Sequence, residues 1–429
     1  MTHSEIKSTE FAAYVGIDWA DQKHDICLQE AGSNQVESLQ LDHKPDSISN
    51  WVSHLQERFQ GQPIALALEQ KRGGLLYSLM HYEFIVLYPV NPKALSSYRE
   101  AFATSGAKDD PVDADLLREM VQLHRDKLRP WTPDDPLTRE LRLLVEYRRR
   151  LVDDKTYLTN RLQALLKQYF PQALAWAGEL DSLLAIDFLT LWPQLEAIQK
   201  ASPEAVLDFY RSHGCRLGEK LPQRLTEIRA ARPLTSDQAV TIASMTMVQA
   251  LLEPLRGLIA GIKSLDQQIE ACYQQHPDKE VFSSLPGAGR VLAPRLLAVF
   301  GADRERYQSA EEIQCLSGVA PVTERSGKTK FVRRRLACPK FVRQSLHEFA
   351  NSSIKWSRWA RAYYDQQRHR GNKHHEAIRA LAYKWTRIIY RCWQDHEPYD
   401  ESVYIAKLEL RGSPLAKLIP TAAEQAVSS

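Results

Sequence analysis

The chain lacks the features that mark several classes of protein. Its 429 residues include six scattered cysteines and no Cys-x-x-Cys pair, so neither a zinc site nor a disulfide framework is predicted, and a reducing cytoplasm is expected. No apolar run approaches the length of a membrane span, and the polar segment 1–11 has no signal-peptide core. We therefore expect no membrane association and a disordered N-terminus over residues 1–11.

Net charge is also nearly absent, at +3, so the overall balance does not identify a partner. The length allows two or three domains. Residues 12–128 predict an α/β domain, in which the continuous apolar run Pro63–Glu69 is typical of a strand buried on both faces. The remaining pattern predicts strands at 12–18, 24–30, 36–41 and 84–89 and helices at 46–59, 73–82, 91–103 and 111–124. Three strands followed by alternating helices and strands is the order of a ribonuclease H-like fold.

Four carboxylates stand at positions where such a fold gathers its chemistry. Asp18 ends the first strand and Glu69 ends the fourth, and the carboxyl ends of adjacent strands meet at one edge of a sheet. Asp110 is predicted to cap a helix that begins at Pro111, with Asp113 on the same face. Paired carboxylates repel unless a cation lies between them, and oxygen ligands suit Mg²⁺ or Mn²⁺. The alternative is an acidic helix start that only favours the helix dipole.

Residues 134–275 predict a helical region. Apolar residues recur at three- and four-residue steps over Leu137–Phe170 and again over Ile242–Gln275, which could return antiparallel to the first helix. A coiled-coil arm and an ordinary amphipathic helix in a bundle both fit this pattern. Between them, residues 173–240 predict an all-α insertion interrupted by prolines and without a recognisable motif.

Residues 280–398 predict a mainly helical C-terminal domain with a glycine turn. The turn at Leu285–Gly289 is similar to a helix-hairpin-helix turn, in which Gly287 and Gly289 would let backbone N–H groups approach a phosphate beside Arg290. A simple turn between two packed helices is the alternative. Residues 347–395 predict two helices whose aromatic residues mostly form a core, and residues 408–429 predict a flexible tail.

A run from Arg325 to Leu346 contains eight basic residues and no acid. Ser326-Gly327 opens this run, and a serine among guanidinium groups is a candidate nucleophile toward phosphodiesters, with Ser317 as the next candidate. Most Ser-Gly pairs are only turns. The basic residues expected to contact nucleic acid are Arg325, Lys328, Lys330, Arg333, Arg334, Arg335, Lys340 and Arg343.

Five short motifs, in this order, resemble those of the DEDD transposases of bacterial insertion sequences, the family named after insertion sequences 110 and 1111. The motifs are Gly16-Ile17-Asp18, Leu68-Glu69, Lys108–Ala114, Leu285–Gly289 and Arg325-Ser326-Gly327.

The resemblance implies an α/β plus all-α protein: an N-terminal RuvC-like domain, a helical coiled-coil arm and a C-terminal transposase domain. It implies a Mg²⁺-binding tetrad at Asp18, Glu69, Asp110 and Asp113, and Ser326 as the residue that forms a 5′-phosphoserine link with DNA. It further implies a structured non-coding bridge RNA that pairs with donor and target DNA, and homodimers that assemble into a tetramer. The expected location is the bacterial cytoplasm, at the nucleoid.

Two other functions stay open on the sequence. The same fold suits a metal-dependent, RuvC-like junction-resolving endonuclease in which Ser326 is a turn residue. A non-catalytic nucleic-acid-binding scaffold is the third hypothesis, although four carboxylates beside phosphate argue against it.

Overall fold

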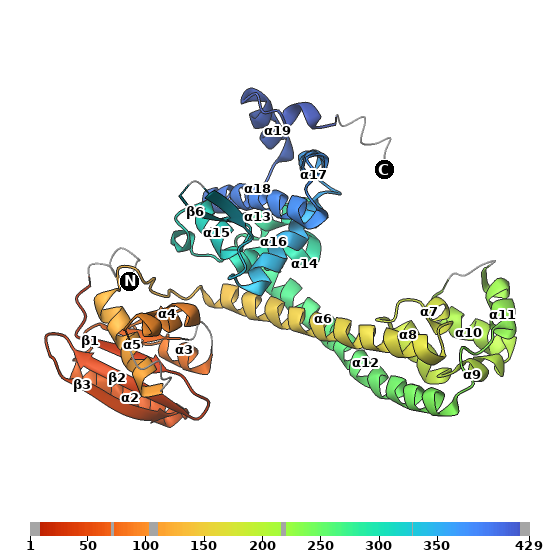
Figure 1. Ribbon diagram of the computed structural model, residues 1–429, viewed down its shortest axis with the longest axis horizontal. Helices are drawn as coiled ribbons and strands as arrows, with labels where there is room; N and C mark the ends of the chain where they lie inside the picture. Colours follow the sequence, from red (N-terminus) through yellow and green to blue (C-terminus); the bar gives the residue numbers. More distant parts are fainter. Residues whose placement is uncertain (1–8, 70–72, 103–109, 216–219, 328, 421–429) are drawn as a thin grey trace. The chain divides into compact units, whose positions relative to one another are not determined.

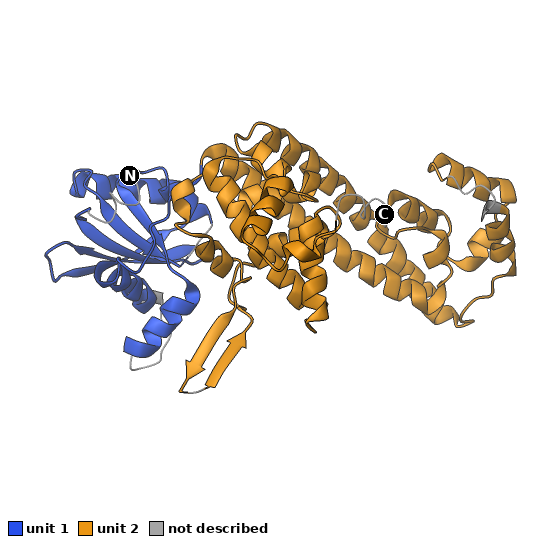
Figure 2. Cartoon of the chain, turned by 90° about the horizontal axis from the view of Figure 1, so that it is seen from above, with its two compact units in different colours: residues 1–134 blue, residues 135–429 orange. Residues whose placement is uncertain are grey.

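The computed structural model describes residues 9–69, 73–102, 110–215, 220–327 and 329–420. The chain divides into two compact units, Met1–Asp134 and Asp135–Ser429, coloured separately in Figure 2. No helix of the described residues is long and apolar enough to cross a membrane.

Unit 1 is built on a five-stranded sheet with the order β3-β2-β1-β4-β5. The central strand β1 pairs antiparallel with β2 and parallel with β4. All five residues of β4 are buried, which explains its continuous apolar sequence. The strands are β1 (Ala13–Asp18), β2 (Lys23–Glu30), β3 (Val36–Asp42), β4 (Ile64–Leu68) and β5 (Ile85–Pro89). All five predicted strands are therefore confirmed, and the topology is consistent with the expected ribonuclease H-like fold.

Four helices cover this sheet: α2 (Pro45–Arg58), α3 (Gly74–Leu79), α4 (Pro92–Phe102) and α5 (Asp110–Leu123). Helices α2 and α3 pack on one face, against Val15, Ile17 and Leu66. Helix α5 packs on the other face, and it crosses β1 so closely that a Cβ on Gly16 would lie 2.0 Å from the carbonyl oxygen of Ala114. Glycine is required at this position because no side chain fits between helix and strand.

The long helices α6 (Pro136–Tyr169) and α12 (Gln238–Gln274) of unit 2 run side by side in opposite directions (Figure 1). Their contacts fix the direction: Thr138 Oγ1 lies 2.9 Å from Nε2 of His276, and Arg148 Nε donates to Asp266 at 2.5 Å. The predicted antiparallel return of the second helix is confirmed.

Helices α7 to α11 form a separate small core at one end of this pair (Figure 1). The predicted all-α insertion is confirmed. Its core is aromatic, with Phe188 in ring contact with Trp192, Phe209 and Tyr210. The helices are α7 (Ala173–Trp176), α8 (Leu183–Leu191), α9 (Leu195–Gln199), α10 (Pro203–Ser212) and α11 (Lys220–Ala230).

The remaining helices of unit 2 pack around Trp359, Trp385 and Trp393, which are all fully buried. They are α13 (Lys279–Ser283), α14 (Gly289–Phe300), α15 (Ala310–Leu316), α16 (Lys340–Ser353), α17 (Arg358–His369), α18 (His374–Asp395) and α19 (Glu401–Leu410), with short 3-10 turns at Arg304–Arg306 and Ala416–Leu418. The sequence predicted two helices over 347–395, whereas the structure has three.

Both predicted terminal disorder segments are wrong for the residues that the structure describes there. Phe11 is buried and packs edge-on against Tyr88, at 6.4 Å between ring centroids. Leu415 is buried in the large core of unit 2. Residues 1–8 and 421–429 lie outside the described residues.

Candidate functional site

Two of the predicted carboxylates stand on neighbouring strands at the same edge of the sheet. Asp18 is the last residue of β1, and Glu69 directly follows β4. These strands are parallel, and Ile17 pairs with Leu68, so Asp18 and Glu69 occupy the next matching positions. Neighbouring strands lie about 4.8 Å apart, which brings the two backbones close together.

Helix α5 points its N-terminus toward this edge. Cys27, which is opposite Gly16, donates its Sγ–H to Asp115 at 3.3 Å. One turn later, Arg118 donates to Gln29, which is opposite Tyr14. These contacts show that α5 runs from the level of Gly16 toward the start of β1. Its first turn, which precedes Asp115, therefore lies near the end of β1 that carries Asp18. Positions 110 and 113 belong to that turn.

The carboxylate of Asp113 is already engaged in this structure. It is buried, and it accepts hydrogen bonds from Arg99 Nε at 2.7 Å and Nη2 at 2.5 Å. Arg99, on α4, supplies the positive charge that a buried carboxylate requires. Among the residues described, no group of three or more metal-ligating side chains is close enough to hold an ion. The side chain of Asp110 is outside the described residues.

The donor set suits the predicted ion in its chemistry, since all of its members offer only carboxylate oxygens. Asp113 would have to exchange the Arg99 guanidinium for the metal. The tetrad Asp18, Glu69, Asp110 and Asp113 thus stays a prediction as a metal site, with Asp18 and Glu69 at one edge of the sheet and Asp113 in the first turn of α5.

Ser326 lies at the tip of a two-stranded ribbon formed by β6 (Val322–Ser326) and β7 (Thr329–Arg333). Figure 2 shows these two strands projecting from the helices of unit 2. Ser326 is exposed and faces Thr329 in register. Gly327 has φ +57, a left-handed conformation that glycine adopts without strain at the first position of a two-residue hairpin turn.

The two faces of the ribbon differ in chemistry. Cross-strand partners share a face, so Ser326 and Thr329 lie on one face and Arg325 and Lys330 lie together on the other. Like charges directly opposite each other destabilise a hairpin, and a bound anion relieves that repulsion. The ribbon thus presents hydroxyl groups on one face and a pair of cations on the other.

The other described residues predicted to contact nucleic acid lie on the ribbon, directly after it and on α16. Arg333 ends β7 and pairs with Glu324 at 3.3 Å, while Lys340 lies 3.6 Å from Asp153 of α6. The acidic partners in these pairs, Glu324 and Asp153, both lie outside the run from Arg325 to Leu346. Arg334 and Arg335 follow the ribbon, Arg343 lies on α16, and Lys328 is outside the described residues.

Packing accounts for one of the two glycines in the turn before α14. A Cβ on Gly287 would meet Trp356 at 2.7 Å, and Ser352 Oγ donates to the Gly287 carbonyl at 2.7 Å. Gly289 has open space around its Cα, and Arg290 beside it is exposed. Within this turn, close approach of a phosphate stays possible at Gly289 and Arg290, since the C-terminal end of α16 and Trp356 after it cover Gly287.

Ser317, the alternative nucleophile, is excluded by burial. Its side chain is fully buried and its Oγ donates to the carbonyl of Gln314 at 3.2 Å. DNA cannot reach this hydroxyl without unfolding the end of α15.

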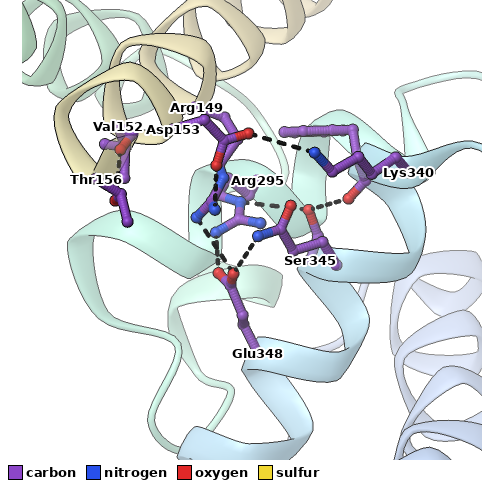
Figure 3. A network of polar contacts seen from close by, with 10 residues as sticks. Arg149, Val152, Asp153, Thr156, Arg295, Lys340, Ser345 and Glu348 are labelled. Carbon is purple, nitrogen blue, oxygen red and sulfur yellow. Dashed lines mark hydrogen bonds and ion pairs between the residues drawn. The ribbon is translucent and has the colours of Figure 1, made fainter. Parts of the chain in front are cut away.

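A buried ionic network, missed in the sequence, holds the helix that follows the ribbon (Figure 3). Arg295 of α14 is 2% exposed and forms an ion pair with Glu348 of α16, and its Nε donates to Ser345 at 3.3 Å. Arg149 of α6 also donates to Glu348, at 3.3 Å. Burial lowers the pKa of Arg295, and Glu348 opposes that shift. The network fixes α16 against both α14 and α6.

Comparisons with known proteins agree with the layout of these elements. A model of a DEDD transposase family, described as "Transposase", matches residues 15–171, and a second, described as "Transposase IS116/IS110/IS902 family", matches residues 279–365. The chain is 26% identical over 402 residues to the mini-circle putative transposase for IS117 of Streptomyces coelicolor, covering 92% of this chain and 97% of that protein. It is 24% identical over 399 residues to an uncharacterized 42 kDa protein of insertion element IS900 of Mycobacterium paratuberculosis, covering 90% and 96%.

Proposed function

Because the chain belongs to the IS110/IS116/IS902 family of insertion-sequence transposases, we propose that it cuts and rejoins donor and target DNA with Ser326 as the nucleophile. The observation that carries this proposal is the position of Ser326 at the exposed tip of a cationic ribbon. A two-stranded ribbon fits the major groove of DNA. A serine at its tip can therefore reach a phosphodiester that a serine in a helical core cannot.

The proposed step is a transfer of a phosphodiester from one hydroxyl to another. Ser326 Oγ attacks the phosphorus and loses its proton, the bond to the 3′ oxygen breaks, and that oxygen leaves as a 3′-hydroxyl after protonation. The product is a 5′-phosphoserine link. Attack by a 3′-hydroxyl of the other DNA reverses the step and releases Ser326, so no external energy source is needed. Arg325 and Lys330, on the opposite face of the ribbon tip, would hold neighbouring phosphates.

The carboxylates Asp18, Glu69, Asp110 and Asp113 would hold Mg²⁺ in the proposed active complex. When bound, Mg²⁺ polarises phosphoryl oxygens and lowers the pKa of a coordinated hydroxyl. The four residues would contribute the negative charge that such an ion needs. In this structure the Arg99 guanidinium holds the Asp113 carboxylate in place.

Activation of Ser326 is proposed to occur only in the assembled complex. Among the described residues, no side chain that could act as a base hydrogen-bonds to Ser326, and a serine hydroxyl is a poor nucleophile without activation. We propose that a structured bridge RNA and two homodimers complete the complex. A chain that cuts only after assembly would avoid breaking DNA at the wrong time.

A cleavage assay with purified protein, guide RNA and labelled element-end DNA tests this function. Wild type should cut, whereas Ser326→Ala and Asp18→Asn should lose cutting while keeping the far-ultraviolet circular dichroism of wild type. Thr329→Val is the matched control, because it removes the facing hydroxyl and keeps the strand. If Ser326→Ala cuts as fast as wild type, the chain is a metal-dependent nuclease of the junction-resolving type.

A further inference from the structure

Five basic side chains gather where the ribbon meets the helices of unit 2. Arg343 and His347 are four residues apart on α16, and His375 and Arg379 are four residues apart on α18, so each pair shares one helix face. The two helices pack against each other. Arg334 directly follows β7, the ribbon strand that begins opposite Ser326.

The other four groups all act on His347 of α16, which packs against α18. The pKa of His347 is lowered to about 4, first by burial and then by the charges of Arg334, Arg379, Arg343 and His375. Its Nε2 is buried without a hydrogen-bond partner among the described residues. A neutral imidazole thus lies beneath four basic groups, of which Arg334 and His375 are exposed and the other two half-buried.

The nearby carboxylates are engaged elsewhere. Glu348, next to His347, is bound by Arg149 and Arg295. Glu376, next to His375, accepts a hydrogen bond from the backbone N–H of Lys373 at 2.8 Å and caps α18. In the part of the chain that the structure describes, no carboxylate forms an ion pair with Arg334, Arg343 or Arg379. This differs from Arg295, which the fold supplies with Glu348. Basic groups held together without an acid favour binding of an external anion.

We propose that Arg334, Arg343, His375 and Arg379, which surround the buried imidazole of His347, form a binding site for a backbone phosphate of the DNA that Ser326 cuts. The site rests on the proposed function, because the ribbon links it to the nucleophile. Arg and His side chains offer several N–H donors to the oxygens of one phosphodiester. DNA is favoured over RNA as the ligand because Arg334 continues the same strand that carries Thr329, the partner of Ser326.

The ribbon also sets the spacing between this site and the cut. From Thr329 to Arg334 the chain advances five residues, which at about 3.3 Å each spans roughly 17 Å. Along duplex DNA, at about 3.4 Å per base pair, this corresponds to about five base pairs. With the ribbon lying along the duplex axis, as the proposal has it, the bound phosphate should lie about five nucleotides from the scissile one.

Salt-dependent binding of the full chain to duplex DNA, with its guide RNA where binding needs it, tests the proposal. A lost phosphate contact lowers the slope of log affinity against log salt by about 0.9. Because Arg343 and Arg379 would bind the same phosphate, Arg343→Gln with Arg379→Gln should lower the slope by about 0.9. The double lysine variant at the same positions should keep the slope. Arg391→Gln is the matched control, because Arg391 lies on α18 but is paired with Asp395 at 2.5 Å.

A second measurement leaves the protein unchanged. Neutral methylphosphonate links are placed one at a time in the DNA, and the link about five nucleotides from the cut should weaken wild-type binding more than its neighbours. The proposal is overturned if the double glutamine variant keeps the wild-type slope and methylphosphonates at all positions act alike. It is also overturned if that variant loses affinity for the guide RNA alone, which would make this an RNA site. Failure of wild type to bind any DNA would instead remove the proposed function itself, and this site with it.

Discussion

Replacing Arg99 by Gln should destabilise unit 1 strongly, because the change leaves Asp113 as an unpaired buried charge. The side chains of Arg99 and Asp113 are 17% and 2% exposed, so water cannot take over the role of the guanidinium. Removing one partner of a buried ion pair costs about 3–5 kcal/mol. Because Arg99 is partly exposed, the lower end of that range is expected.

The double variant Arg99→Gln/Asp113→Asn separates two effects: the loss of the ion pair, and the cost of leaving the Asp113 charge buried without a partner. It removes both charges, so it should recover most of the stability that Arg99→Gln loses. If Asp113 is also a metal ligand, Mg²⁺ at one hundred times its dissociation constant should stabilise Arg99→Gln by about 2.7 kcal/mol, and it should stabilise wild type by less. Asp113→Asn should abolish this difference.

Hydrogen exchange followed by mass spectrometry measures these effects within unit 1, since peptides from β1 and α5 report on it alone. Arg99→Gln could instead lower the stability of unit 1 by less than about 0.5 kcal/mol, as ordinary surface substitutions do. That result would refute a stabilising role for the buried Arg99–Asp113 pair. Equal stabilisation of wild type and Arg99→Gln by Mg²⁺ would refute competition between the guanidinium and the metal.

Two further predictions concern the packing of α5 and the charge of the insertion. Gly16→Ala should cost at least about 3 kcal/mol in the free energy of unfolding of unit 1, because its Cβ would meet backbone atoms of α5 at 2.0 Å and 2.4 Å, whereas Gly257→Ala, with nothing within 4 Å, should be neutral or stabilising. Equal unfolding midpoints in urea for the two variants would contradict the close crossing. Asp187 accepts a hydrogen bond from His213 and raises the pKa of that imidazole above 6.5. The pair should therefore stabilise the insertion fully below about pH 6.5 and lose its contribution as pH rises through the raised pKa. Hydrogen exchange of α10 against pH should show this loss in wild type and not in His213→Gln; the same pH dependence in both would refute it.

The sequence predicted the elements whose burial leaves a repeating pattern. β4 is buried on both faces and reads as a continuous apolar run, and α6 and α12 keep their helical spacing over their whole length. The placement of Asp18 and Glu69 followed from the strand order alone, because parallel neighbours end at one edge. These predictions needed only local periodicity and the rules of sheet connection.

What the sequence did not predict depends on residues that are distant along the chain or on strands without a buried face. The ribbon β6–β7 is almost entirely exposed, so it has no apolar alternation, and its signal in the sequence was the Ser326-Gly327 turn. Arg99 and Asp113 lie fourteen residues apart on different helices, and Arg295 and Glu348 fifty-three. The spacing of residues along the sequence does not predict such pairs, because the two side chains meet only when their helices pack together.

The most direct measurement is the chemical identity of the protein–DNA link. Wild-type protein, guide RNA and labelled DNA are incubated, stopped with denaturant and digested with trypsin, which cuts after Arg325 and Lys328. Mass spectrometry should find the 5′-phosphate of the cut strand on Ser326, with a free 3′-hydroxyl on the other fragment and no link in Ser326→Ala. DNA cut without any link to protein, or a link that persists in Ser326→Ala, would contradict Ser326 as the nucleophile.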